Sequence, residues 1–91
     1  MVFRYNYSSR AERQLARIPQ RERERVINRV QQLAKDPTGR GTKQLKGQSI
    51  LWAARVGDLR VVYEIDDEAE VIYIEAIGNR DNIYEIVRRL R

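Results

Sequence analysis

The fold of this chain is decided by residues 50–65, which read ILWAARVGDLRVVYEI. On both sides of Gly57 and Asp58 the side chains follow a period of two, the spacing of a β-strand. Two residues with glycine first, placed between two such runs, are typical of a type II′ hairpin turn. The stretch therefore predicts two antiparallel strands, near 50–56 and 59–65, joined by a tight turn.

The register of this hairpin would place two arginines opposite each other. With residues 57 and 58 as the turn, the second pair outward is Arg55 facing Arg60. Like charges about 5 Å apart across a sheet destabilise it. An anion shared between the two guanidinium groups would turn the pair into a binding site, and phosphate suits arginine well. Two ordinary arrangements stay open: the side chains extend into solvent, or they meet Glu64 on the same face.

The same counting sorts the rest of the hairpin into two faces. The face with the two arginines carries Leu51, Ala53, Val62 and Glu64, and the other carries Trp52, Ala54, Val61 and Tyr63. We interpret the second face as core. A base could stack on Trp52, but a single Trp among apolar residues is more often a packing residue.

Before the hairpin, the pattern predicts a strand and two helices. Residues 3–7 alternate as in a short half-buried strand, and Ser8 or Ser9 caps a first helix. Residues 20–35 carry one apolar stripe and form the second helix of a helical hairpin. The turn-forming residues 36–42 make a loop between this pair and the sheet.

After the hairpin, a turn at 66–70 leads to a further strand at 71–77, and a short amphipathic helix closes the chain. The order is β-α-α-β-β-β-α. An α+β fold is expected, in which the N-terminal helical hairpin packs on a small, mainly antiparallel sheet. With 91 residues, 42% of them hydrophobic, the chain is expected to form one domain, residues 1–91.

The charge of the chain favours a polyanionic partner. Lys and Arg number 18 against 13 Asp and Glu, a net charge of +5. Residues 1–47 hold twelve basic and four acidic side chains, whereas residues 48–91 hold six basic and nine acidic ones. Arginine accounts for fifteen of the basic residues, and its planar fork suits phosphate. The ordinary alternative is that most of these arginines only solvate helix surfaces.

The residues that are missing exclude several kinds of site. With no Cys, the chain has neither disulfides nor a thiolate metal site. With no His, it has no histidine acid–base pair. We expect no metal and no cofactor. The start of the chain lacks a signal-peptide pattern and no apolar run is long enough to cross a membrane, so we expect a cytoplasmic protein with no membrane partner.

The end of the last predicted strand carries another candidate group. Arg80 follows Gly78 and Asn79, and Tyr84 lies four residues further, so Arg80 and Tyr84 could share a helical face. A glycine before a helix lets backbone approach a ligand closely. The alternative is an ordinary strand-to-helix turn, with Arg80 in solvent and Tyr84 half buried.

Together these features resemble the RelE branch of the RelE/ParE toxin superfamily. The resemblance spans the whole chain and rests on Lys46-Gly47, Trp52, RVGD at 55–58, RVVYEI at 60–65, and GNR at 78–80 with Tyr84. It implies a toxin of a type II toxin–antitoxin system that cleaves mRNA in the ribosomal A site. The implied partners are the ribosome, its mRNA and a cognate acidic antitoxin, partly disordered, that folds on binding.

The resemblance also implies roles for individual residues. It assigns catalysis to Arg55, Arg60, Arg80 and Tyr84. The expected RNA contacts are Lys43, Lys46, Arg55, Arg60 and Asn79. The chain departs from the family pattern at Ala53, where many members carry Lys or Arg, and at Leu59, where an aromatic residue is common.

The reaction implied by the resemblance is attack of an RNA 2′-hydroxyl on the adjacent phosphorus. The arginines would stabilise charge on the phosphorane, but they are poor proton carriers. Tyr84 would orient or deprotonate the 2′-hydroxyl, with Glu64 a weaker candidate base. Two other functions stay open: a ParE-like toxin that poisons gyrase, and a non-catalytic module that binds RNA or an acidic partner.

Overall fold

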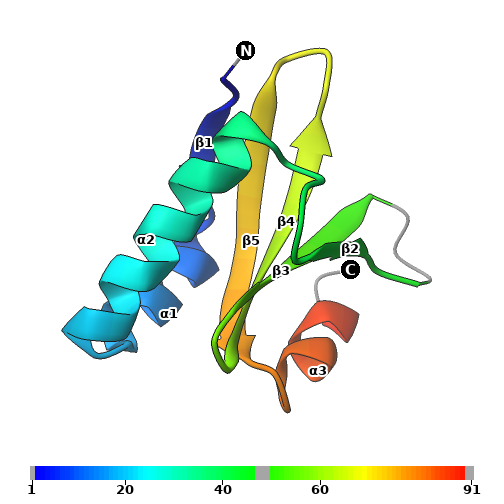
Figure 1. Cartoon of the computed structure of the whole chain (residues 1–91). Coiled ribbons are helices and arrows are strands. Elements are labelled where there is room, and N and C mark those ends of the chain that lie inside the picture. Colours follow the sequence, from blue (N-terminus) through cyan, green and yellow to red (C-terminus); the bar gives the residue numbers. More distant parts are fainter. Residues whose placement is uncertain (1, 47–49, 90–91) are drawn as a thin grey trace.

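The computed structural model describes residues 2–46 and 50–89. Within these ranges the chain forms five strands and three helices, in the order β1 (Arg4–Tyr7), α1 (Ser9–Arg17), α2 (Gln20–Lys35), β2 (Thr42–Gln44), β3 (Leu51–Val56), β4 (Leu59–Asp66), β5 (Val71–Asn79) and α3 (Ile83–Arg88). The strands make one sheet in the order β1-β5-β4-β3-β2 (Figure 1). Only β1 and β5 are parallel; the other neighbours are antiparallel. The predicted α+β fold, mainly antiparallel, is confirmed.

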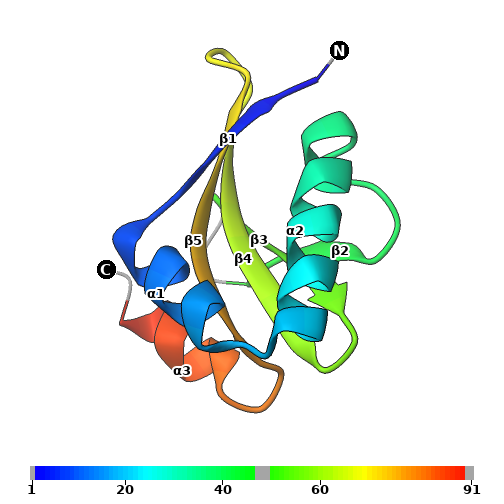
Figure 2. The ribbon, with the colours of Figure 1, turned by 90° about the vertical axis from the view of Figure 1, so that its left-hand side faces the viewer.

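Helices cover both faces of the sheet. Figure 2 shows α1 and α2 over one face, with α3 near the lower end of the sheet. The larger core cluster lies under α1 and α2 and includes Val26, Leu33, Tyr63 and Ile74. Trp52 packs against it, as predicted. A second cluster, with Ile83 and Val87 of α3, covers part of the other face.

The second cluster buries part of the sheet face that carries the two arginines. Leu51, Ala53 and Val62 share that face with the arginines, as the register requires, but they are buried against α3 residues. Residues of α3 therefore bury part of this face. The arginine pair lies at the end nearest the hairpin turn.

The boundaries of the first elements follow local chemistry. Ser8 caps α1, because its Oγ accepts a hydrogen bond from the backbone N–H of Ala11 at 3.0 Å. The loop predicted over residues 36–42 ends earlier than expected. Thr42–Gln44 form the short edge strand β2 instead, paired with β3. The side chains of these three residues show no alternation, so only their pairing with β3 defines the strand.

The central hairpin has the predicted geometry. Gly57 has a φ of 60°, as the first central position of a type II′ turn requires. Arg55 faces Arg60 in the β3–β4 pairing. On the other side of β4, the pairing with β5 shifts between Val62 and Tyr63, and this bulge skips Glu75. None of the described helices is long and apolar enough to cross a membrane.

Candidate functional site

An open cavity of about 430 Å³, called the basic hollow below, lies beside the arginine pair. It is lined by Gly41, Thr42, Lys43, Ala53, Arg55, Arg60 and Tyr84. These residues come from β2 and the loop before it, from β3 and β4, and from the first turn of α3. The hollow therefore exists only once the sheet edge and α3 are assembled.

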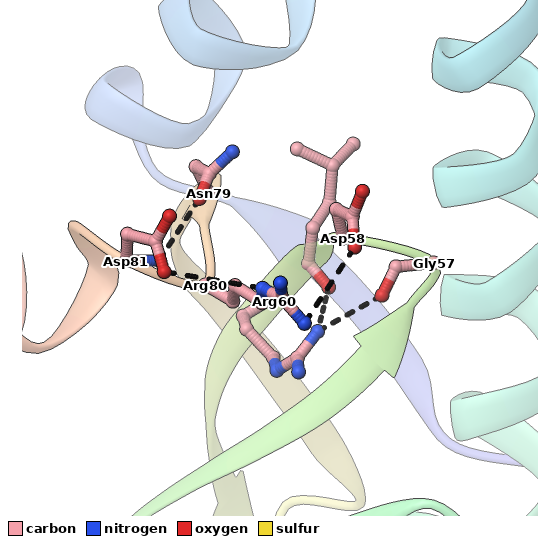
Figure 3. A network of polar contacts seen from close by, with 7 residues as sticks. Gly57, Asp58, Arg60, Asn79, Arg80 and Asp81 are labelled. Atoms are coloured by element: carbon pink, nitrogen blue, oxygen red, sulfur yellow. Dashed lines mark hydrogen bonds and ion pairs between the residues drawn. The ribbon is translucent and has the colours of Figure 1, made fainter.

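The two arginines are held differently. Arg55 is exposed, whereas Arg60 is partly buried. The Nη1 of Arg60 donates to the carbonyl oxygens of Gly57 at 3.0 Å and Leu59 at 2.9 Å, which folds its side chain back against the turn (Figure 3). In the described chain neither arginine forms an ion pair with a carboxylate. Their charges remain available to an anion.

Glu64 does not meet the arginine pair. It faces Leu51 on one side and Tyr73 on the other, roughly 13 Å along β4 from Arg60 at the usual rise of a strand. Its charge acts instead on Glu75: burial, and then the charge of Glu64, raise the pKa of the Glu75 carboxyl. The alternative that Glu64 neutralises the arginines is therefore wrong, and its candidacy as a base loses support.

A lysine and a tyrosine form the opposite wall of the hollow. The Nζ of Lys43 lies 5.4 Å from the centre of the Tyr84 ring, within cation–π range. Tyr84 is 41% exposed. Its neighbour Ile83 is fully buried and anchors α3. The contact between Lys43 and Tyr84 joins the edge strand to the last helix, a pairing that the sequence does not indicate.

Hydrogen bonds from Arg29 of α2 and from Tyr63 of β4 hold the loop before β2 in place. The Nη2 of Arg29 donates to the carbonyl oxygen of Arg40 at 2.7 Å, and Gly41 follows with a φ of 80°. The Tyr63 hydroxyl donates to the carbonyl oxygen of Pro37. Burial raises the pKa of Tyr63 to about 12. These contacts place residues 41–43 beside the hollow.

Gly41 and Thr42 were not among the predicted site residues. The Thr42 hydroxyl donates to the carbonyl oxygen of Gly39 at 2.7 Å, so it serves the loop. The signal that could have found them was the cluster of turn formers just before Lys43. What the cluster does not reveal is that the chain next pairs with β3.

Arg80 lies beside the hairpin turn and is not among the residues that line the hollow. Its backbone N–H donates to the carbonyl oxygen of Asp58 at 2.9 Å, and its side chain lies 3.9 Å from the carboxylates of both Asp58 and Asp81 (Figure 3). The expectation that Arg80 and Tyr84 share a helical face is wrong, because α3 begins only at Ile83.

The other predicted RNA contacts lie further out. Asn79 is exposed, and its Oδ1 accepts from the backbone N–H of Asp81 at 2.9 Å, which shapes the turn after β5. Lys46 is exposed and does not line the hollow.

Gly78 gives α3 room to pack. A Cβ on Gly78 would lie 3.2 Å from the Cδ1 atoms of both Ile83 and Ile86. The glycine therefore lets the helix pack closely across β5, and the approach of a ligand to its backbone stays a prediction.

The chemistry of the hollow is cationic. Its lining contains no carboxylate. In residues 2–46 and 50–89 no group of three or more His, Cys, Asp or Glu could hold a metal ion. What the arrangement offers is two guanidinium groups, an ammonium group and a phenol around one open space, a set suited to a phosphate ester.

The fold and the hollow define a class: a small α+β domain with a basic site at the end of a central hairpin. Comparison with known families then identifies it. The family model described as "ParE toxin of type II toxin-antitoxin system, parDE" matches residues 5–84. The chain therefore belongs to this family, within the RelE/ParE superfamily, and is a toxin of a type II toxin–antitoxin system.

Solved structures agree with this assignment. The chain is similar to a chain of the RelBE2 toxin–antitoxin complex of Mycobacterium tuberculosis, with 27% identity, a TM-score of 0.79, and 88% of this chain and 100% of that chain covered. It is also similar to a chain of the archaeal RelE–RelB complex of Pyrococcus horikoshii, with 26% identity, a TM-score of 0.77, and coverage of 88% and 97%.

A mutant of the Escherichia coli toxin RelE in the free state shares the fold, with 19% identity, a TM-score of 0.80 and 100% of both chains covered. No curated protein sequence matches the chain. The resemblance to RelE toxins inferred from the sequence is confirmed.

Proposed function

We propose that this toxin is a metal-independent endoribonuclease that acts in the cytoplasm and cuts mRNA in the ribosomal A site. The observation that carries the proposal is the convergence of Arg55, Arg60, Lys43 and Tyr84 on one open hollow whose lining has no carboxylate. Two facing arginines without a counter-charge cost the fold stability. A bound phosphate would offset that cost.

The proposed reaction is transesterification within the RNA. The 2′-oxygen attacks the neighbouring phosphorus, the bond from phosphorus to the 5′-oxygen breaks, and the products end in a 2′,3′-cyclic phosphate and a 5′-hydroxyl. The proton that leaves the 2′-hydroxyl and the proton that the departing 5′-oxygen takes up are exchanged with solvent, so the protons balance. No water is consumed in this step.

The residues of the basic hollow have different roles in this reaction. The guanidinium groups of Arg55 and Arg60 stabilise the charge on the phosphorane, an electrostatic contribution that is often the largest in catalysis. They stay protonated, so they do not move protons. Tyr84 also lines the hollow, where its phenol orients the 2′-hydroxyl or, as the phenolate, accepts its proton. Alignment of the message for attack is left to the ribosome.

Arg80 acts in this proposal from the side of the hollow. Its pairs with Asp58 and Asp81 are long, at 3.9 Å, and its side chain is 60% exposed. Exposed pairs of this kind contribute little stability. Its guanidinium can therefore leave these partners and reach an RNA phosphate at low cost.

The proposed inhibitor is an acidic antitoxin. The similar chains from M. tuberculosis and P. horikoshii are parts of toxin–antitoxin complexes with RelB-type partners. A partner with negative charge would cover the basic hollow and so block access of RNA.

The decisive experiment is cleavage of a defined message on purified ribosomes by the Arg55→Ala variant. Arg55 is exposed and its side chain forms no hydrogen bond or ion pair with the described residues, so the variant should stay folded. We expect cleavage to fall by about 10² to 10³, the usual cost of one charge-stabilising group. Arg13→Ala, which removes the same charge on α1, should cleave normally. Undiminished cleavage by the Arg55 variant would remove the hollow from the mechanism.

Arg80→Ala tests the outlying arginine in the same assay. We expect a folded protein that no longer arrests growth on expression. Full toxicity of this variant would show that Arg80 takes no part.

Ala53 offers a test by gain of function. It is only 3% exposed, yet it lines the hollow beside Arg55, so a longer side chain can extend into the open space. Ala53→Lys should raise cleavage if the hollow lacks only a cation. A folded variant without that gain would mean that this site is arranged differently from the family pattern.

A second function is favoured by the description of the matching family, which names ParE toxins. Under this alternative the protein poisons gyrase and cuts no RNA. Primer extension on transcripts after expression separates the two: codon-linked cuts support the nuclease, whereas DNA damage without such cuts supports the gyrase poison.

A further inference from the structure

A second open cavity, of about 410 Å³, lies between α2 and the tip of the β3–β4 hairpin. We call it the tip hollow. It is lined by Arg21, Glu22, Arg25, Val56, Gly57, Asp58 and Leu59. The basic hollow lies on the other face of the same hairpin, so the two cavities are separated only by the turn.

Two arginines of α2 point into the tip hollow. Arg21 and Arg25 are four residues apart and so share one helical face. The Nη atoms of Arg25 lie 3.3 Å from where a Cβ on Gly57 would be, so its guanidinium group rests against the turn. In the described part of the chain neither arginine forms an ion pair. Both side chains thus line one cavity without an ion-pair partner among the described residues.

The tip hollow also carries two carboxylates, Glu22 and Asp58, which balance the formal charge of the two arginines but form no ion pair with them in the described chain. Glu22 lines the hollow but makes no ion pair among the described residues. The Asp58 carboxylate lies 3.9 Å from the guanidinium group of Arg80. A surface where arginines gather without pairing to nearby carboxylates is suited to a polyanion.

Arginines from both cavities surround the hairpin turn. Gly57 accepts a hydrogen bond from Arg60 of the basic hollow at 3.0 Å, and Arg25 rests against the same glycine from the tip hollow. Arg80 lies beside the turn, bound through its backbone to Asp58 (Figure 3). Cationic groups therefore follow one another from one cavity to the next, which suits the repeating phosphates of a single strand.

We propose that the tip hollow holds the phosphates of the message that flank the nucleotide in the basic hollow. The inference rests on the proposed function in taking RNA as the ligand. Arg21 and Arg25 are then backbone-binding residues outside the reaction, and they contribute affinity without reading the sequence. The message is favoured over another RNA because arginines of the tip hollow and of the basic hollow contact the same turn.

The test is salt-dependent binding of single-stranded RNA to the purified toxin, with oligonucleotides of about four and about twelve residues. The variant is Arg21→Ala/Arg25→Ala. Its matched control is Arg13→Ala/Arg17→Ala, which removes two exposed arginines from α1. We expect the slope of log K against log salt for the long oligonucleotide to shrink by about 1.4, since each lost phosphate contact on a single strand removes about 0.7. The control should keep the slope, and the short oligonucleotide should bind both proteins equally.

Equal losses in the variant and the control would overturn the proposal, because the effect would then come from diffuse charge. A variant with weaker ribosome binding but normal oligonucleotide binding would also overturn it, since the occupant would be ribosomal RNA. Arg21→Lys/Arg25→Lys should restore the slope, which separates charge from a folding defect. The assay measures binding and not cleavage. The proposal on the tip hollow can therefore be supported even if the proposed nuclease activity is absent.

Discussion

Replacement of Ile83 by alanine should detach α3 from the sheet without unfolding the rest of the protein. Ile83 is fully buried in the second core cluster, against Ala53, Val62 and Ala76. The helix has only six residues, Ile83–Arg88, and helices this short are not stable alone in water. Its position therefore depends on a few buried side chains.

The magnitude follows from the size of the side chain. Ile83→Ala removes three carbon groups, worth about 0.8 kcal/mol each, or about 2.4 kcal/mol before any cavity forms. A loss of that size falls almost wholly on the docking of α3, because the other elements keep their contacts. At 1.4 kcal/mol for each factor of ten, amide exchange in residues 83–88 should quicken about fiftyfold.

Hydrogen exchange resolved by residue is the assay. The amides of β4 and β5 should keep their protection, and cleavage should fall because Tyr84 leaves the basic hollow with the helix. Leu33→Ala is the matched control. It truncates a fully buried residue of α2, so it should lower global stability without a selective increase of amide exchange in α3. If Ile83→Ala quickened exchange equally in β4 and β5, local detachment would be refuted.

Three further predictions concern the loop, the core and the wall of the hollow. Arg29→Ala should lower the free energy of unfolding by about 1 kcal/mol in denaturant melts, and it should weaken RNA binding because the loop before β2 loses a hydrogen bond. Unchanged RNA binding would show that this hydrogen bond is not needed to position the loop. The raised pKa of Tyr63, about 12, means that the unfolded state ionises first, so stability should fall as pH rises from about 10 to 12. Tyr63→Phe should make that fall shallower, leaving the part due to Tyr7, whose pKa burial also raises to about 12; an unaltered pH profile would contradict the assignment. Lys43→Ala should weaken RNA binding, whereas Lys43→Arg should retain it because arginine also stacks on Tyr84; equal losses in the two variants would rule out a role for the cation.

The central hairpin was predictable because its determinants are local. Glycine at the first turn position selects the turn, and the turn selects the register that sets Arg55 against Arg60. The helical hairpin followed from its apolar stripe and the Ser8 cap. Some candidate residues of the hollow were also found this way, and the family resemblance gave a catalytic role to Tyr84, which its spacing from Arg80 had already singled out.

The parts that could not be predicted depend on contacts between distant segments. Thr42–Gln44 form a strand by pairing with the edge of β3, and α3 packs closely on β5 where Gly78 leaves room for Ile83 and Ile86. The bulge at Glu75, which arises between two strands, has no local signal.

The sequence by itself determined the hairpin, its facing arginines and the class of fold, because turn chemistry and side-chain periodicity act between near neighbours. Only the tertiary structure decided that Lys43 meets Tyr84, and that Arg25 rests against the same turn as Arg60. These residues come from elements far apart in the chain, and packing on the two faces of one sheet brings them together.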